Sequence, residues 1–397
     1  MQRHIRTQLD TWVEALWQQR LTRRDLLQRG ATAGIAAALL TEIIAPYTRQ
    51  VAAEMRPSPQ VLAHIAKEGK KLFIANWEDY VNPKTIPQFE KEFGVKVTYD
   101  TFPGNEQLLA KLQAGGVKYD VVFPTHNFIP IYLAQGLLAP LQHAHLPLLS
   151  NLMARFRQTV VDPGNIYTVP YSWGMTGLAL NTTHIPLDTP RFGSWALLFE
   201  DGPQRYSGKL GCTDEREEVI AAALQYLGHN PNTRTPATLR QAGEVLMRLK
   251  PHIKAFYPGV ESRKALITED IMLAQTWSGE TVKAQAKNSA VVWRLPKEGG
   301  TLWFDAMVIP KNAPHKVTAE VFINYMLRPE VAADNANTTG YATANQAAAE
   351  KYLAPEVATN PAIYPTADEL ARATLLETIP DDLLPLYEEI WTQLLGA

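Results

Sequence analysis

Short apolar runs alternate with amphipathic stretches between residues 71 and 123. Runs of about five mostly apolar residues are typical of buried strands, whereas longer stretches with apolar side chains on one face are typical of helices. The pattern predicts strands at 71–75, 95–99 and 119–123, separated by helices at 83–93 and 105–114. This βαβαβ order indicates a parallel sheet with helices on both faces.

Turn-forming residues mark the ends of both predicted helices. Asn82 and Pro83 suit the N-cap and the first helical position of the first helix. Gly94 suits the left-handed position that ends it, and Gly115 with Gly116 closes the second helix in the same way. The hydrophobic pattern and the helix signals therefore agree on where the chain turns.

A second α/β region is expected from about residue 177 to residue 296. The expected elements in and after it are helices at 216–227, 236–249, 318–327 and 383–395, strands at 271–275, 291–295 and 301–310, and a turn at 338–341. A chain of 397 residues is long for a single small core, so we expect a two-domain α/β protein.

The first 53 residues differ from the rest. Arg23 and Arg24 precede an alanine-rich apolar stretch, residues 31–40, that is too short to span a bilayer stably. This pattern is typical of a twin-arginine export signal, recognised by export machinery and removed after Ala53. The alternative is an amphipathic N-terminal helix that stays attached. Residues 54–70 are expected to form a linker or a loosely docked first helix.

Composition and charge narrow the class of protein. Hydrophobic residues make up 46% of the chain and charged residues 20%, which excludes a disordered chain. The net charge of −2, with no lysine and arginine stripe, gives no sign of nucleic-acid binding. Cys212 is the single cysteine, so no intramolecular disulfide can form, and we expect a buried structural thiol.

Three distant segments place tryptophan near carboxylates. They are residues 76–80 (Asn-Trp-Glu-Asp-Tyr), 277–280 (Trp-Ser-Gly-Glu) and 303–305 (Trp-Phe-Asp). Ring faces attract cations and a buried carboxylate needs a cation, so together these segments suit an organic ammonium ligand. The alternative is that the tryptophans are core residues. The first segment directly follows a predicted parallel strand, where ligands bind in such sheets.

Common catalytic signatures are missing from the sequence. It contains no phosphate-binding loop, dinucleotide-type glycine triplet, Gly-x-Ser-x-Gly elbow or paired-histidine zinc motif. His143 and His145 have no evident third metal ligand. The sequence therefore predicts no cofactor and no metal, and it favours a binding protein over an enzyme.

Eight motifs in order give the chain a family resemblance. They are residues 76–81 (NWEDYV), 119–124 (YDVVFP), 169–174 (VPYSWG), 277–279 (WSG), 296–300 (PKEGG), 303–305 (WFD), 327–329 (LRP) and 340–341 (GY). Over residues 71–395 the chain resembles the bacterial spermidine/putrescine-binding proteins.

The resemblance implies a two-lobed α/β periplasmic binding protein fold with the ligand in a cleft between the lobes. We expect residues 71–177 with 303–345 to form the first lobe and residues 178–302 with 346–397 to form the second. The implied function is a monomeric periplasmic receptor that binds putrescine or spermidine and docks on the permease of an ABC importer.

The resemblance also implies a set of ligand-binding residues. Five aromatic residues are expected around the methylene chain of the ligand: Trp77, Tyr80, Trp277, Trp303 and Tyr341. Asp305 is expected to bind one ammonium group, Glu215 and Glu218 the other, and Thr125 to supply a hydroxyl contact. The chain has Asn127 where relatives have tyrosine, Glu215 where they have aspartate, and Glu377 near the position of a ligand-binding glutamine. These departures leave the preferred polyamine open.

Three other functions fit the same residues. One is a receptor for an amino acid or for a quaternary ammonium compound, the latter being attracted to rings without needing so many carboxylates. An exported enzyme acting on amines would hold its substrate in the same way. A sensor would pass the occupied state of the cleft to a membrane protein without transport.

Overall fold

The computed structural model describes residues 58–116 and 118–396. The chain divides into two compact units, Met1–Pro59 and Gln60–Ala397, and the fold below is that of the second unit. The predicted export signal, including Arg23, Arg24 and Ala53, lies outside the described residues.

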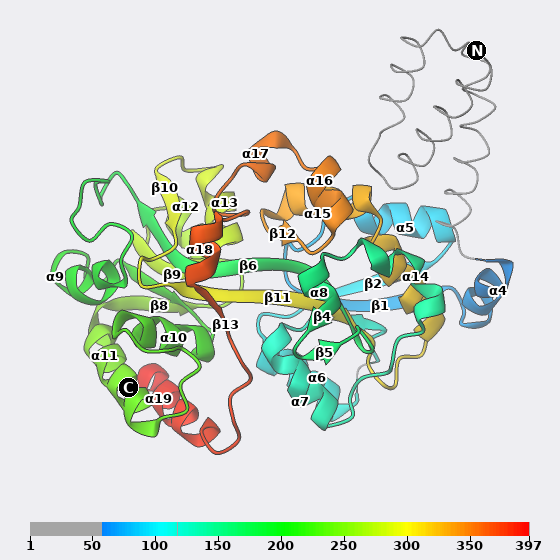
Figure 1. Cartoon of the computed structure of the whole chain (residues 1–397), viewed down its shortest axis with the longest axis horizontal. Coiled ribbons are helices and arrows are strands. Elements are labelled where there is room, and N and C mark those ends of the chain that lie inside the picture. The colour runs from blue at the N-terminus through cyan, green and yellow to red at the C-terminus, as the bar shows by residue number, and fades with distance from the viewer. Residues whose placement is uncertain (1–57, 117, 397) are drawn as a thin grey trace, which may run out of the picture. The chain divides into compact units, whose positions relative to one another are not determined.

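A mixed sheet organises this unit (Figure 1), with strand order β2-β1-β3-β11-β6-β9-β7-β8. In chain order these strands are β1 (Lys71–Asn76), β2 (Lys96–Thr101), β3 (Val121–Val122), β6 (Thr168–Asn181), β7 (Leu210–Thr213), β8 (Ile253–Tyr257), β9 (Leu273–Trp277) and β11 (Gly300–Val308). The remaining strands are β10 (Val291–Arg294) and β12 (Ala342–Thr343), which pair with β6, β13 (Ala373–Leu375), which pairs with β11, and the hairpin β4 (Gln158–Thr159) and β5 (Asp162–Pro163).

Two parallel groups of strands flank an antiparallel pair. Strands β2, β1 and β3 are parallel, as are β9, β7 and β8, whereas β11 and β6 run antiparallel to each other between the two groups. This arrangement confirms the predicted βαβαβ unit and the two-lobed α/β fold. Figure 1 shows β6 and β11 crossing from one group to the other.

Helices cover both groups. The first group carries α4 (Pro59–Lys67), α5 (Thr85–Phe93), α6 (Asn105–Ala114), α7 (Ile129–Ala134), α8 (Ala154–Arg157), α14 (Lys316–Met326), α15 (Pro329–Thr339), α16 (Gln346–Lys351) and α17 (Pro355–Ala358). The second carries α9 (Gly202–Arg205), α10 (Arg216–Tyr226), α11 (Pro236–Leu249), α12 (Glu261–Ile267), α13 (Ser278–Gln285), α18 (Ala367–Arg372) and α19 (Leu384–Leu395). Short 3₁₀ turns lie at His126–Phe128, His143–His145, Pro147–Asn151 and Lys250–His252, and a π-helical turn at Leu197–Asp201.

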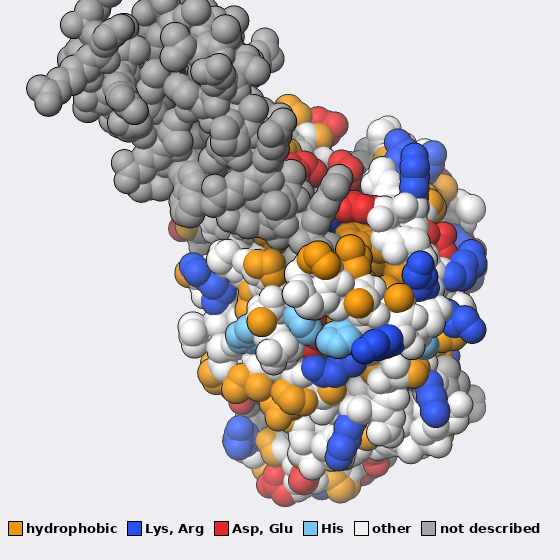
Figure 2. Space-filling view, turned by 90° about the vertical axis from the view of Figure 1, so that its right-hand side faces the viewer, with side chains coloured by type: hydrophobic (Ala, Val, Ile, Leu, Met, Phe, Trp, Pro, Cys, Tyr) orange, Lys and Arg blue, Asp and Glu red, His pale blue; other side chains and the backbone are white. Residues whose placement is uncertain are grey.

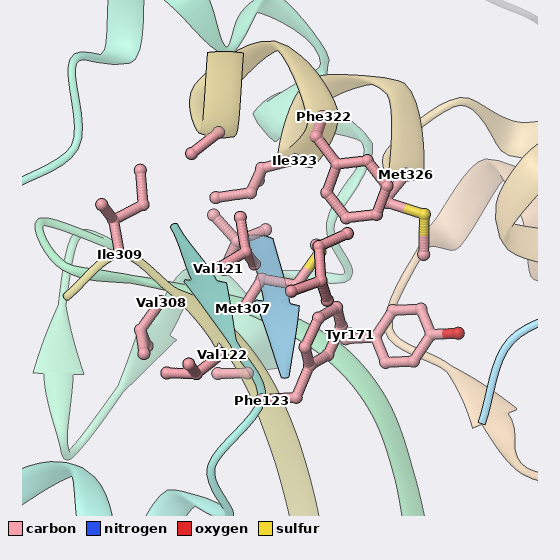
Figure 3. Close-up of a cluster of buried hydrophobic side chains, with 14 of the residues drawn as sticks. Val121, Val122, Phe123, Tyr171, Met307, Val308, Ile309, Phe322, Ile323 and Met326 are labelled. Carbon is pink, nitrogen blue, oxygen red and sulfur yellow. The ribbon is translucent and has the colours of Figure 1, made fainter. Parts of the chain in front are cut away.

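Each group has its own apolar core. In the first, side chains of β3, the end of β11 and α14 interdigitate, as Figure 3 shows for Val122, Met307 and Phe322. In the second, α10, α11 and α19 enclose a cluster that includes Cys212 and Ile390. Cys212 is buried, which raises the pKa of its thiol to about 12 and agrees with a structural role.

The structure differs from the sequence prediction at two places and decides between alternatives at a third. The sequence pattern did not predict β6, because all of its residues are buried and the strand therefore lacks polar and apolar alternation. The predicted turn at 338–341 begins inside α15, which ends at Gly340 in a left-handed conformation (φ 72°). Of the linker or docked helix expected at 54–70, Pro59–Lys67 form the helix α4, whose Ile65 is buried in the first core.

The expected lobe boundary after residue 345 cuts through packed elements. Ala348 of α16 packs with Ala332 and Ala333 of α15, and Ile363 belongs to the first core. We propose that the first lobe continues to about residue 364. The chain then returns to the second group through β13, which pairs with β11.

Surface charge on one described face is mixed. Figure 2 shows lysine and arginine side chains scattered among polar, histidine and apolar ones on the visible described part of that face. Within the described residues no helix has the length and apolar character needed to span a bilayer.

Candidate ligand-binding site

Residues from both parallel groups surround one cavity. It encloses about 60 Å³, several times the ~10–15 Å³ that one water molecule requires. Its lining contains nine of the ten predicted ligand-binding residues, Trp77, Tyr80, Thr125, Glu215, Glu218, Trp277, Trp303, Asp305 and Tyr341, together with Glu78, Asn105, His126, Asn127, Glu217, Gly259, Val260, Glu280 and Leu376.

Strand direction brings these side chains together. The segment from Trp77 to Tyr80 follows β1 and Thr125 follows β3, so they lie at the carboxyl ends of parallel strands. In the second group, Glu215 follows β7 and Trp277 ends β9. The rule that ligands bind at the carboxyl edge of parallel sheets therefore applies to both groups.

Asp305 forms one acidic pole of the cavity. It lies at a β-bulge in β11, where the pairing with β6 shifts register between Asp305 and Ala306. The hydroxyl of Tyr80 donates to Oδ2 at 2.6 Å, while the described residues leave Oδ1 without a hydrogen-bond partner. Burial raises the pKa of Asp305 to about 7, although the hydroxyls of Tyr80 and Thr125 oppose part of that rise.

Glu215 and Glu218 form a second acidic pole at the start of α10. The indole Nε1 of Trp277 donates to Glu218 Oε2 at 2.8 Å, and no described residue bonds Oε1 of the buried Glu215. Burial raises the pKa of Glu218 to about 8. Burial, followed by the charges of Glu106 and Glu218, raises the pKa of Glu215 well above its ordinary value. Two desolvated carboxyls one helical turn apart therefore strongly favour a cation between them.

Aromatic rings form the wall of the cavity. The Trp77 and Trp277 rings meet edge to face at 6.1 Å, and Tyr341 makes similar contacts with Tyr80 at 5.4 Å and with Trp303 at 5.2 Å. Trp77 and Trp303 are also anchored through their indole nitrogens, to Phe123 O at 2.9 Å and Thr176 Oγ1 at 3.2 Å. The rings are therefore preorganised to contact an apolar chain or a cation.

The other acids at the cavity are already paired or exposed. Lys283 and Arg263 contact Glu280 at 2.5 and 3.3 Å, and Arg216 contacts Glu217 at 2.8 Å. Glu78 is exposed. The carboxylates open to a cation in the described site are therefore those of the two poles.

Glu377 lies outside the cavity. Its side chain is 60% exposed and stands 3.5 Å from Arg234, and the neighbouring residue, Leu376, lines the cavity instead. The backbone of this segment is fixed by Asn232, whose Oδ1 accepts from the amide of Glu377 at 2.9 Å. Glu377 is therefore the one predicted ligand-binding residue that does not line this cavity.

Some lining residues were not predicted from sequence. Asn105 follows β2, so the rule on strand ends could have identified it, and its side chain bonds both the amide and the hydroxyl of Thr125. Gly259 and Val260 follow β8 in the same way. Leu376 carries no sequence signal, because an apolar residue in a loop resembles any partly buried contact.

Gly279 leaves room for Tyr341, and this predicts an effect of substitution. A Cβ at Gly279 would lie 2.3 Å from the Tyr341 ring, so Gly279→Ala must displace a ring of the cavity wall. We expect it to weaken ligand binding about tenfold or more, equivalent to the loss of roughly 1.4 kcal/mol. Titration calorimetry measures the change. Gly116→Ala is the matched control, since its Cβ would meet nothing within 4 Å, and equal affinities of the two variants would contradict the prediction.

Comparison with known proteins shows to which family the chain belongs. The model of the bacterial extracellular solute-binding protein family matches residues 84–366. The chain belongs to this family. It is 35% identical over 345 residues to the putrescine-binding periplasmic protein PotF of Escherichia coli, covering 83% of this chain and 92% of the relative. It is 32% identical to the putrescine-binding periplasmic protein SpuD of Pseudomonas aeruginosa, covering 83% and 93%.

Solved structures of similar sequence share the fold of this chain. A protein described as a putative spermidine/putrescine ABC transporter from Listeria monocytogenes superposes with a TM-score of 0.77 at 35% identity, covering 82% of this chain and 99% of that one. The spermidine/putrescine substrate-binding protein PotD of Streptococcus pneumoniae gives a TM-score of 0.70 at 32% identity, covering 82% and 98%. This solute-binding protein therefore shares both sequence and fold with proteins named for polyamines.

Proposed function

We propose that this solute-binding protein is a periplasmic receptor that binds a polyamine, putrescine or spermidine, and delivers it to an ABC importer. One observation supports this most directly: two acidic poles, Asp305 and the pair Glu215 and Glu218, share one aromatic-walled cavity. The names of its relatives support the same ligand class.

A polyamine matches this cavity in charge and in shape. Its ammonium groups are separated by methylene chains, so it needs separated carboxylates with flat apolar surfaces between them. The Trp77, Trp303 and Tyr341 rings supply those surfaces. Micromolar affinity requires only about 8 kcal/mol, which two desolvated ion pairs and ring contacts can supply after the costs of association.

Transport would require opening of the cavity. Residues of both parallel groups line it, so movement of the groups apart would widen access to the poles. The segments that cross between the groups, β6, β11 and the chain near β13, are the proposed hinge. Periplasmic binding proteins as a class close around their ligands by hinge motions of this kind. We further propose that the receptor acts as a monomer, docks on a membrane permease, and is exported through residues 1–53.

Titration calorimetry of the protein lacking residues 1–53 tests the proposal. Putrescine or spermidine should bind with a dissociation constant in the micromolar range or tighter, about 8 kcal/mol or more. γ-Aminobutyrate should bind far more weakly, because its carboxylate would face one of the acidic poles. The absence of heat with any diamine or polyamine would reject the proposal.

No observation favours an enzyme acting on amines. Among the described residues no group of three or more histidine, cysteine, aspartate or glutamate side chains suits a metal ion. Cys212 is buried in the second core, with a raised thiol pKa. Mass spectrometry of a polyamine incubated with the protein measures turnover directly, and an unchanged polyamine is expected.

A further inference from the structure

Glu280 lines the cavity and yet is neutralised from within the chain. It is 2% exposed, and its Oε1 accepts a hydrogen bond from the Tyr341 hydroxyl at 3.3 Å. The ammonium of Lys283, one turn further along α13, lies 2.5 Å from Oε1, and the Arg263 guanidinium lies 3.3 Å from Oε2. A buried carboxylate with two cations beside it has little remaining attraction for a third.

Positive and negative charges are equal in the cluster formed by Asp79, Glu280, Arg263 and Lys283. Arg263 also contacts Asp79 at 2.6 Å, and the hydrogen bond from Arg263 lowers the pKa of Asp79, which keeps that carboxyl ionised. Two carboxylates, Asp79 and Glu280, thus face two cations, Arg263 and Lys283. Removal of Lys283 alone would leave one negative charge without a counterion at the cavity wall.

Lys283 makes the contacts that a ligand ammonium would make. Its Nζ lies over the Tyr341 ring, 5.5 Å from the centroid, and beside the Glu280 carboxylate. The Tyr341 ring also contacts the rings of Tyr80 and Trp303, and the Tyr80 hydroxyl donates to Asp305. A carboxylate with an aromatic ring beside it is also what the two open poles offer to a cation.

We infer that Lys283 neutralises Glu280, which lines the cavity, and thereby favours ligands with two ammonium groups over ligands with three. This rests on the proposed function. Glu215, the N-cap residue of α10, and Glu218, one turn further on, act as one pole because like charges so close together resist full ionisation. The cavity therefore offers two acidic poles to a ligand. Lys283 is a positioning residue, because it neutralises Glu280 and so keeps that carboxylate from pairing with a ligand ammonium group.

Lys283→Met tests the inference, because methionine keeps an apolar side chain of similar length and removes the charge. We expect the ratio of putrescine to spermidine affinity, measured by calorimetry, to shift by about tenfold or more toward spermidine. A merely structural defect would weaken both ligands together. Lys254→Met is the matched control, since Lys254 pairs with Asp270 outside the cavity, and it should leave the ratio unchanged.

The double variant Lys283→Met with Glu280→Gln separates the freed carboxylate from other effects. The shift toward spermidine should disappear in it, and circular dichroism should show that both variants are folded. Should Lys283→Met fail to fold, Lys283→Gln provides the same test. An unchanged ratio in a protein that binds putrescine overturns the inference and leaves the proposed function intact. A wild-type protein that binds neither amine overturns the proposed function and this inference with it.

Discussion

Asp305→Asn is expected to weaken polyamine binding by about 2 to 5 kcal/mol, the usual cost of removing one partner of a buried charge pair. The substitution keeps the size of the side chain and an oxygen that can accept from Tyr80. It replaces the open carboxylate oxygen by an amide, which carries no charge to pair with an ammonium group. Because Asp305 is only 4% exposed, water cannot substitute for the missing carboxylate.

Asp188→Asn is the control for this variant, since it removes the same charge from an exposed position outside the cavity. Calorimetry with putrescine compares the two. The Asp305 variant should also unfold at least as high in temperature as the ligand-free wild type, because it removes a carboxyl that is costly to bury. A loss of affinity below about threefold, less than 1 kcal/mol, would show that Asp305 does not pair with the ligand.

Strand order and residue type together predicted most of the cavity. Trp77 and Tyr80 follow a strand whose apolar run is plain in the sequence, so their place at the carboxyl edge could be inferred from the sequence alone. Asp305 was a candidate from its tryptophan-rich segment, but its role and the choice of Glu215 and Glu218 came from the family resemblance, because an acid near a strand end or helix start has several structural roles. Nine of the ten residues lie around one cavity.

The remaining features depend on contacts between distant segments. Glu280 and Asp79 look as available as Asp305 in the sequence, and only the fold brings Arg263 of α12 beside both. Glu377 aligned with a ligand-binding position in a weakly matched segment, and the structure turns Leu376 toward the cavity instead. Side-chain pairing of this kind leaves no periodic signal, so sequence patterns cannot report it.

Ligand affinity is expected to rise with pH. Burial raises the pKa of Asp305 to about 7 and that of Glu218 to about 8. At about pH 6 both groups therefore hold protons, and each must lose its proton before it can pair with an ammonium group. Binding lowers both pKa values, so protons are released on binding and affinity increases as pH rises. Because both carboxyls must lose a proton, the increase should approach about three orders of magnitude between about pH 6 and about pH 8.5.

Loss of protons from the ligand's ammonium groups limits the rise in affinity only at higher pH. Alkyl ammonium groups resemble the lysine side chain, whose ordinary pKa is about 10.4, so the ligand remains charged throughout the rise. Calorimetry in two buffers with different ionisation enthalpies measures the protons released directly. The number should be largest near pH 6 and should decline as the pH rises through the pKa values of Asp305 and Glu218. Above them only Glu215, whose pKa burial also raises, could still release a proton.

Asp305→Asn connects the two experiments. It removes the group with the lower pKa, so near about pH 6.5 the variant should release close to one proton fewer than the wild type. Glu218, with a pKa of about 8, would still lose its proton on binding, so the variant should keep a shallower rise in affinity with pH. An affinity that is constant or falls between about pH 6 and 8.5 would mean that the poles are ionised before the ligand arrives. The carboxylates would then be hydrated while the two groups of strands are apart. The free-energy cost of desolvating them would arise when the cavity closes, not when they lose their protons.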